Sequence, residues 1–267
     1  MYKVVISDLD GTLFNSKYKI TNYTKRTIKL LISKGIKFII ATGRHYMDLI
    51  DLKNNLNLNS YLVTSNGSRI YDLKGNLVFN SFLEKSVVSS LLKIRRNDEE
   101  ITTQIYTNDN WYIDTNEYNN NFCKKLSLKY KLLKFVNFSL HKVNKIFFTS
   151  SNIKKLENLK KEIIFLWGSK KKINVFFSFP ECLEIVPYKV SKGKSLKFIS
   201  NLLGFSTKDF IAFGDGMNDQ DMLEISGKGC IMGNADLKLK KTLNSMEVIS
   251  TNEQDGVACY LRSLFSL

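Results

Sequence analysis

The chain has 267 residues, of which 43% are hydrophobic and 24% charged, so it is long enough for one large or two modest globular domains. Its net charge is +15, but only six of the 40 basic residues are arginine and the lysines are spread along the whole chain. This distribution argues against a nucleic-acid-binding stripe, because arginine is the residue suited to bidentate phosphate and base contacts.

The sequence also speaks against metal-thiolate, secreted and membrane classes. Its four cysteines, Cys123, Cys182, Cys230 and Cys259, form no CxxC pair and no disulfide framework. The N-terminus reaches Asp8 too soon for a signal peptide, and no apolar run approaches the roughly 20 residues of a membrane span. We therefore expect a cytoplasmic protein without a membrane partner.

The first 80 residues alternate between short apolar runs and one amphipathic stretch. Residues 4–6 predict a buried strand, residues 24–34 a helix with Thr21 or Asn22 as its N-cap, and residues 38–41 and 61–63 two more strands. Gly35 stands where a helix commonly ends in a left-handed residue. This order is typical of an open α/β sheet.

The same alternation returns near the C-terminus. A helix is expected after Ser191 and up to Gly204, followed by a strand at 210–213, a helix around 222–225 and a strand at 230–232. The middle of the chain differs, with alternating runs at 103–113, 145–149 and 174–179 between lysine- and asparagine-rich helical stretches. We expect an α+β insertion in an α/β domain.

Two carboxylates follow the first predicted strand. Asp8 and Asp10 are two residues apart, so they can face the same way, and ligands of α/β sheets bind at the carboxyl ends of strands. Gly11 allows a tight exit from the strand. A turn with solvated acids is the simpler alternative, whereas an EF-hand fits poorly because a strand precedes the motif.

A second acidic segment, 214–219, closes the strand at 210–213. Asn218 or Asp219 can act as a helix cap, and with Asp215 they can also meet the first acidic pair if the two strands are neighbours. Converging carboxylates repel one another and favour a hard cation. Because no histidine accompanies these oxygen ligands, Mg²⁺ is the predicted metal rather than zinc.

Two further positions suit an anion. The Thr42 hydroxyl and the backbone N–H groups after the strand at 38–41 can hold phosphate oxygens. Lys192 opens its predicted helix, where a point charge adds to a ready anion site, although a solvated lysine is the simpler alternative. A P-loop is excluded because Tyr188 occupies the position of its first glycine. His45 follows the Thr42 segment and is either a substrate contact or a surface residue at a helix start.

Taken in order, residues 8–12, 42–44, Lys192 and 214–219 resemble the four motifs of the haloacid dehalogenase-like superfamily. Three further segments are similar to its Cof-type branch: 65–67, 232–235 and 255–258. The resemblance implies an α/β protein with a Rossmann-like parallel-sheet core, residues 1–82 plus 187–267, and an inserted α+β cap, residues 83–186, which selects the substrate.

Within that branch the chain looks like an enterobacterial pyridoxal phosphate phosphatase that also acts on sugar phosphates. The segments that carry this likeness are 1–5, 42–45, 64–67, 182–184 and 227–233. Asn234 stands where that enzyme has serine, and the cap is richer in lysine and asparagine, so the substrate is left open more than the chemistry.

The resemblance also implies roles for individual residues. Asp8 is the expected nucleophile and Asp10 the expected acid and base, in a magnesium-dependent phosphatase with an aspartyl-phosphate intermediate. Asp8, the Asp10 carbonyl and Asp215 are the expected Mg²⁺ ligands, and Asp219 the residue that orients Lys192 or a metal-bound water. The expected phosphate-binding residues are Leu9, Thr42, Gly43, Lys192 and Asn218.

Two other functions stay open on the sequence. A phosphotransferase or phosphomutase would use the same motifs and pass the phosphoryl group to a sugar hydroxyl. A non-enzymatic, basic nucleic-acid-binding protein is motivated by the charge of +15, but the acidic clusters would repel a polyphosphate backbone. The expected partner is a small phosphorylated metabolite rather than nucleic acid.

Overall fold

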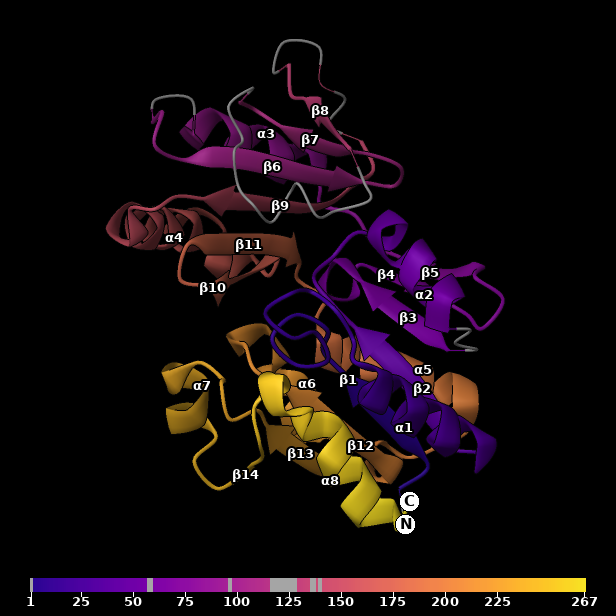
Figure 1. The fold of residues 1–267 in the computed structure, drawn as a ribbon. Coiled ribbons are helices and arrows are strands. Elements are labelled where there is room, and N and C mark those ends of the chain that lie inside the picture. The colour runs from indigo at the N-terminus through magenta and orange to yellow at the C-terminus, as the bar shows by residue number, and fades with distance from the viewer. Residues whose placement is uncertain (1, 57–59, 96–97, 116–128, 135–137, 139–140) are drawn as a thin grey trace.

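The computed structural model describes residues 2–267 except 57–59, 96–97, 116–128, 135–137 and 139–140. Two units, each built on its own sheet, lie one above the other (Figure 1). Both termini belong to the lower unit, and the upper unit is inserted in its chain (Figure 1). This arrangement is the α/β fold with an α+β insertion that the alternation of elements predicts.

The lower sheet has eight strands in the order β14-β13-β12-β1-β2-β3-β4-β5. The strands from β14 to β3 are parallel, and β4 and β5 are added antiparallel at one edge. Their bounds are β1 Val4–Ser7, β2 Lys37–Ala41, β3 Tyr61–Thr64, β4 Arg69–Tyr71, β5 Leu77–Asn80, β12 Phe210–Gly214, β13 Lys228–Ile231 and β14 Glu247–Val248.

Helices cover both faces of this sheet. Helices α1 and α8 pack together on one side, and α5 and α6 on the other (Figure 1). The bounds are α1 Asn22–Ser33, α2 Ile50–Leu56, α5 Lys192–Leu203, α6 Gln220–Ile225, α7 Leu237–Thr242 and α8 Gly256–Phe265. Thr21 caps α1 through its side chain, and Gly35 and Gly204 follow α1 and α5 with positive φ, as predicted.

Among its described residues the upper unit has a six-stranded sheet in the order β10-β11-β9-β6-β7-β8 and two α-helices. The predicted alternating run at 103–113 contains two strands, because the turn around Asn108-Asp109-Asn110 folds it into a hairpin. The bounds are α3 Lys85–Arg95, β6 Thr102–Thr107, β7 Trp111–Ile113, β8 Tyr130–Leu132, β9 Val143–Thr149, α4 Ile153–Trp167, β10 Ile173–Phe179 and β11 Cys182–Pro187.

Each unit has its own apolar core. In the upper unit the alternate residues Ile146 and Phe148 of β9 pack with α3 and α4, whereas Lys145 and Phe147 lie on the opposite face of the strand. No helix in the described ranges is long and apolar enough to span a membrane. Cys182, Cys230 and Cys259 are free thiols, and Cys123 lies outside the described residues.

The upper core depends on Phe148, which is fully buried. Phe148→Ala should lower the free energy of unfolding by about 3–5 kcal/mol, because truncation leaves a cavity that the sheet and helices cannot fill. The matched control is Phe165→Ala on α4, since that ring is 86% exposed. Scanning calorimetry should show a large loss for the first variant and almost none for the second; equal losses would contradict the assignment of the core.

Candidate active site

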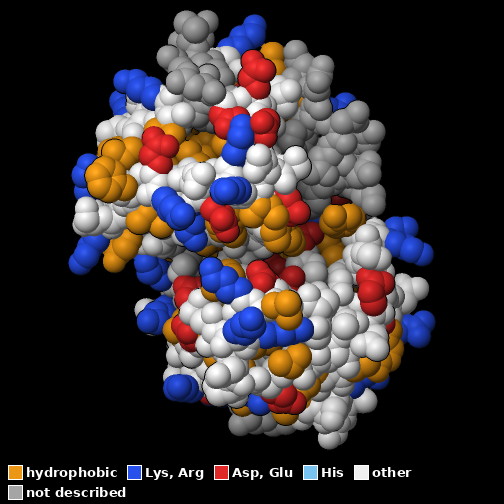
Figure 2. Space-filling view, turned by 90° about the vertical axis from the view of Figure 1, so that its left-hand side faces the viewer, with side chains coloured by type: hydrophobic (Ala, Val, Ile, Leu, Met, Phe, Trp, Pro, Cys, Tyr) orange, Lys and Arg blue, Asp and Glu red, His pale blue; other side chains and the backbone are white. Residues whose placement is uncertain are grey.

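The candidate residues meet at the carboxyl ends of three adjacent parallel strands. Strand β1 lies between β12 and β2, so Asp8, Asp215 and Thr42 follow neighbouring strands at one edge of the sheet. A cavity of about 980 Å³ opens there between the two units, and the space-filling view shows the hollow with acidic side chains in it (Figure 2). Among the predicted site residues, the ones lining the cavity are Asp8, Asp10, Thr42, Gly43, Asp215 and Asn218.

Lys192 joins the two acidic segments beneath this cavity. Its Nζ donates to Asp8 Oδ1 and to Asp219 Oδ1, each at 2.6 Å, and its side chain is 0% exposed. Lys192 is the first residue of α5, whose N-cap is Ser191. The ammonium group therefore touches the nucleophile candidate directly, which a solvated surface lysine would not do.

Asp219 serves this lysine and the short 3-10 turn Met217–Asp219, and it does not cap α6. Its Oδ2 accepts the backbone N–H groups of Asp215 and Gly216 at 3.0 Å, and its Oδ1 accepts Lys192. Although Asp219 directly precedes α6, its side chain makes no capping bond there. All of these bonds hold Asp219 as a support for Lys192 and for the backbone of the second acidic segment.

Asp215 is held over the loop that follows β1. The Thr12 hydroxyl donates to Asp215 Oδ1 at 2.7 Å. Gly11 lies so close that a Cβ added to it would stand 2.2 Å from Asp215 Oδ2, and its φ of +77° also favours glycine. The absence of a side chain at Gly11 thus allows the two acidic segments to approach each other.

Burial and crowding raise the pKa of both central carboxyls. For Asp8 burial is the largest cause, and the charges of Asp219, Asp215 and Asp10 add to it, while Lys192 opposes them. Burial and then Asp219 raise the pKa of Asp215 to about 7. Burial lowers the pKa of Lys192, but the charges of Asp219 and Asp8 outweigh it and hold that pKa above its ordinary value. The cluster therefore favours an additional positive charge.

Asp10 is paired with a guanidinium group. Arg44 Nε donates to Asp10 Oδ2 at 2.7 Å and Nη2 donates to Oδ1 at 2.5 Å. The guanidinium also lies over the rings of Phe14 and Tyr18. Arg44 has no predicted role, because its contact with Asp10 joins two segments that lie 34 residues apart in the sequence.

The predicted phosphate-binding groups differ in how far they face the cavity. Thr42 Oγ1 accepts the backbone N–H of Arg44 at 3.2 Å, so its own hydroxyl hydrogen stays available to a ligand. Asn218 Nδ2 donates to Asn66 Oδ1 at 3.0 Å. The Leu9 side chain packs in the apolar core, and neither Leu9 nor Lys192 lines the cavity.

His45 is a structural residue and not a surface one. It is 0% exposed, its Nδ1 accepts the N–H of Met47, and its Nε2 lies 2.9 Å from the carbonyl oxygen of Thr107 in the upper unit. Burial lowers its pKa to about 4, so the ring is neutral and Nε2 carries the hydrogen for Thr107. His45 does not line the large cavity.

The upper unit contributes cavity residues that the sequence motifs did not predict. Tyr106, Lys145 and Glu184 are not among the predicted site residues. All three are buried and line the large cavity. The period-two alternation of 145–149 places Lys145 on the face opposite the buried isoleucine and phenylalanine, which is the one clue in the sequence.

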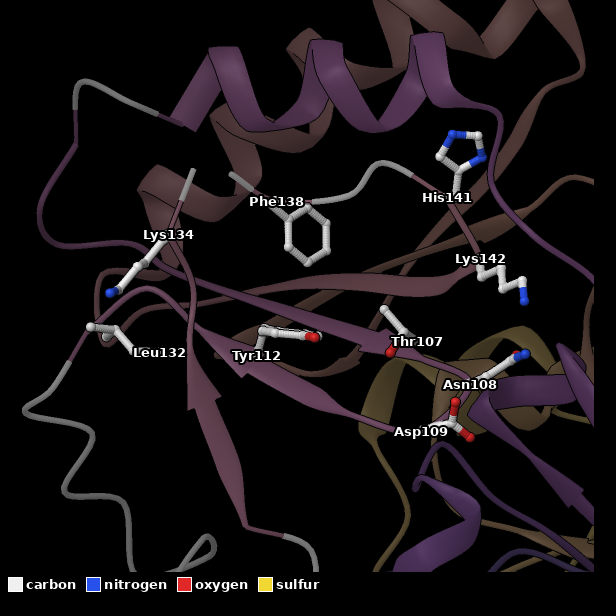
Figure 3. Close-up of a pocket in the computed structure, with 9 residues that line it drawn as sticks. All are labelled: Thr107, Asn108, Asp109, Tyr112, Leu132, Lys134, Phe138, His141 and Lys142. Carbon is white, nitrogen blue, oxygen red and sulfur yellow. The ribbon is translucent and has the colours of Figure 1, made fainter. Parts of the chain in front are cut away.

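The upper unit has a second cavity of about 410 Å³, which contains none of the predicted site residues (Figure 3). Tyr112 and Phe138 face each other in it, with ring centroids 5.1 Å apart. Its other lining residues are Thr107, Asn108, Asp109, Leu132, Lys134, His141 and Lys142.

The donor set beneath the large cavity fits a hard divalent cation. One carboxylate oxygen from each of Asp8, Asp215 and Asp219 lies within 4.8 Å of the others, and no histidine or cysteine belongs to this group of described residues. Because both oxygens of Asp219 are already hydrogen-bonded, Asp8 and Asp215 are the better ligands. Four carboxylates with Lys192 and Arg44 leave a local charge of −2 when all are ionised, which Mg²⁺ would balance.

Comparison with known proteins places the chain in a family. The sequence pattern of the haloacid dehalogenase-like hydrolases matches residues 5–261. A provisionally named phosphatase of Buchnera aphidicola subsp. Schizaphis graminum is 50% identical over 266 residues, covering 99% of this chain and 96% of that protein. The HMP-PP phosphatase of Yersinia pestis (strain Pestoides F) is 32% identical over 267 residues, covering 100% of this chain and 96% of that protein.

Solved structures agree with this placement. A haloacid dehalogenase-like hydrolase from Bacteroides thetaiotaomicron superposes with a TM-score of 0.83 at 28% identity, covering 99% of this chain and 100% of that one. The resemblance predicted from the motifs is confirmed. The chain belongs to the haloacid dehalogenase-like hydrolase family and is a phosphatase.

Proposed function

We propose that this phosphatase hydrolyses small phosphate monoesters with Mg²⁺ through an aspartyl-phosphate on Asp8. The observation that carries the proposal is the buried bridge from Lys192 to both Asp8 and Asp219, placed beside Asp10 and Asp215 under one cavity. A buried ammonium group that touches the nucleophile neutralises charge where an anionic carboxylate must approach an anionic phosphate.

In the first step the Asp8 carboxylate attacks phosphorus, the bond from phosphorus to the leaving oxygen breaks, and Asp10 gives that oxygen a proton. In the second step Asp10 takes a proton from water, the water oxygen attacks phosphorus, and the acyl-phosphate bond breaks. Inorganic phosphate leaves and the Asp8 carboxylate is restored. Two displacements thus replace one difficult attack by water.

Arg44 limits how Asp10 can take part in these two steps. The guanidinium group donates to both carboxylate oxygens of Asp10, the atoms that must give or take a proton in the two steps. To act as the acid, Asp10 must be protonated and leave Arg44. We infer that substrate binding separates this pair, since both residues line the cavity that the substrate would enter.

The remaining groups form a cradle for the phosphoryl oxygens. We assign to it the Thr42 hydroxyl, the backbone N–H groups of Leu9 and Gly43, the Asn218 amide and the Lys192 ammonium. The Asp8 and Asp215 carboxylates with the Asp10 carbonyl would hold Mg²⁺, which supplies positive charge toward the phosphoryl group. Asp219 would keep Lys192 aimed at Asp8.

The upper unit, taken as residues 83–186, is proposed to act as a cap that selects the leaving group. The cavity volume of about 980 Å³ is at the upper end of small-molecule sites, which favours a metabolite over a polymer. On the face in Figure 2 basic side chains are scattered over both units without forming a stripe. Pyridoxal phosphate, sugar phosphates and the HMP-PP of the Yersinia pestis relative are the substrates to test.

Asp8→Asn should lower kcat by at least about 10³-fold. The amide is a poor nucleophile, and the other catalytic groups cannot act when no aspartyl-phosphate forms. The readout is phosphate release from p-nitrophenyl phosphate with MgCl₂, with trapping of acid-stable radiolabel on the protein. Asp51→Asn on the exposed part of α2 is the matched control. Near-normal turnover by Asp8→Asn would contradict the mechanism.

Mg²⁺ should stabilise the protein more at high pH. The metal-free fold keeps the Asp215 proton up to about pH 7, whereas the unfolded chain loses it near the ordinary value of 3.8, so stability falls as pH rises through that window. Asp215→Asn should therefore raise the melting temperature of metal-free protein at pH 8, have a smaller effect at pH 5, and remove the response to MgCl₂.

Calorimetry of both proteins at the two pH values tests this expectation. A variant that still gains stability from MgCl₂, or that loses stability equally at pH 5 and pH 8, would contradict the assignment of Asp215.

A substrate screen should find turnover on pyridoxal phosphate, on a sugar phosphate or on HMP-PP, with one of them at least about tenfold above the rest in kcat/KM. Such a ratio is what one or two additional polar contacts in a cap provide. Free phosphate and phosphate isomers are both quantified. An isomeric product with little free phosphate would replace hydrolysis by a mutase reaction.

A further inference from the structure

A buried ion pair in the upper unit plays no part in the mechanism above. Lys145 Nζ on β9 donates to Glu184 Oε2 on β11 at 2.7 Å, and the two side chains are only 4% and 5% exposed. Lys145 also lies 4.8 Å and 4.5 Å from the ring centroids of Tyr106 and Phe147. Aromatic rings and a carboxylate thus hold the ammonium group in one place on the sheet face turned to the cavity.

This pair is hydrogen-bonded to the lower unit at two points. Lys145 Nζ donates to the carbonyl oxygen of Gly43 at 2.8 Å. Asn66 Nδ2 donates to Glu184 Oε2 at 2.5 Å. The Gly43 contact reaches the loop after β2, and Asn66 lies in the turn after β3, so the pair spans two adjacent loops of the lower sheet.

Asn66 continues the connection to a third loop. Its Oδ1 accepts Asn218 Nδ2 at 3.0 Å, and its backbone N–H donates to the Thr42 carbonyl oxygen at 3.0 Å. A Cβ added to Gly43 would stand 3.3 Å from the Asn66 side chain, so the two residues are in close contact. Asn218, Asn66, Glu184, Lys145 and Gly43 therefore form one continuous chain of hydrogen bonds.

The backbone at Asn66 indicates that its placement is enforced. Its φ is +55°, and Ser65 before it has a φ of +50°, a region that costs energy for residues other than glycine. Both residues are buried. Such a conformation persists where surrounding contacts over-determine it, and here those contacts come from both units.

Stability alone explains this arrangement poorly. A buried ion pair must overcome the desolvation of both charges, and well-packed neutral residues often stabilise a fold equally well. The pair instead fixes the positions of two hydrogen-bonding groups: the Lys145 ammonium, which donates to the Gly43 carbonyl, and the Glu184 carboxylate, which accepts from Asn66. Gly43 and Asn66 in turn adjoin the two cradle groups, the Gly43 N–H and the Asn218 amide.

We propose that the Lys145–Glu184 pair is a positioning device that completes the phosphate cradle when the cap lies over the core. Through Gly43 directly, and through Asn66 to Asn218, it holds two cradle groups that come from different loops. The inference rests on the proposed function, since it uses the assigned cradle. Movement of the cap away from the core breaks both connections and leaves Gly43 and Asn218 less ordered.

The experiment measures affinity for inorganic phosphate with MgCl₂ by calorimetry and, in parallel, kcat and KM for p-nitrophenyl phosphate. The double variant Lys145→Met/Glu184→Gln removes both charges together and so avoids a buried unpaired ion. We expect phosphate binding and kcat/KM to weaken about tenfold, the effect of losing one or two hydrogen bonds. Lys172→Met/Glu84→Gln, which removes an exposed ion pair of the same unit, should change neither.

Asn66→Gly provides a second test that keeps the ion pair. Glycine adopts the φ of +55° at this position and adds no charge, but it removes the side-chain hydrogen bonds to Glu184 and Asn218. We expect a similar loss of phosphate affinity, and little further loss when this change is combined with the double variant, because all three act on one chain. This variant keeps the proposal testable if the double variant does not fold.

The outcomes are distinct. If the wild-type protein neither binds phosphate nor hydrolyses the ester, the proposed function is wrong. If the wild-type protein does both and the folded variants bind phosphate equally well, the positioning role is overturned, even when their melting temperatures are lower. Weaker phosphate binding in both Lys145→Met/Glu184→Gln and Asn66→Gly, with the Lys172→Met/Glu84→Gln control unchanged, supports it.

Discussion

The bridge from Lys192 to Asp8 and Asp219 is the constraint around which the lower unit is organised. It brings together the ends of β1 and β12 and the start of α5, and it does so at a position where the ammonium group has no access to solvent. A charge buried in this way is tolerable only when it is paired and hydrogen-bonded. The pairing therefore explains why both carboxylate oxygens of Asp219 are occupied by hydrogen bonds within the fold.

The same crowding gives the site its chemistry. Burial, together with the crowding of four carboxylates around two cations, raises the pKa values of Asp8 and Asp215, so ionisation of all four would leave an unbalanced negative charge beneath the cavity. A divalent cation resolves that imbalance and is consistent with the oxygen-only donor set. Arg44 adds a second constraint, because its guanidinium group donates to both carboxylate oxygens of Asp10.

Much of the fold was predictable from local pattern. The strand at β1, the helix that ends before Gly35 and the helix that ends at Gly204 follow from short-range rules of burial and capping, which act within a few residues. The alternating run at 103–113 holds two strands, because its alternation of polar and apolar residues does not mark the turn at Asn108. Alternation reports which face a residue takes and does not report where the chain reverses.

By itself the sequence determined the order of the motifs, the α/β alternation and the family, because each depends on residue identities within a few positions of one another. Only the tertiary structure decided that Arg44 pairs with Asp10, that His45 is a buried contact between the units, and that Lys145 and Glu184 meet at the cavity. These contacts join segments 34 to 62 residues apart, and their partners are selected by strand order and by the packing of one unit on the other. No local pattern records that selection, since it arises when the sheets and helices bury their apolar faces together.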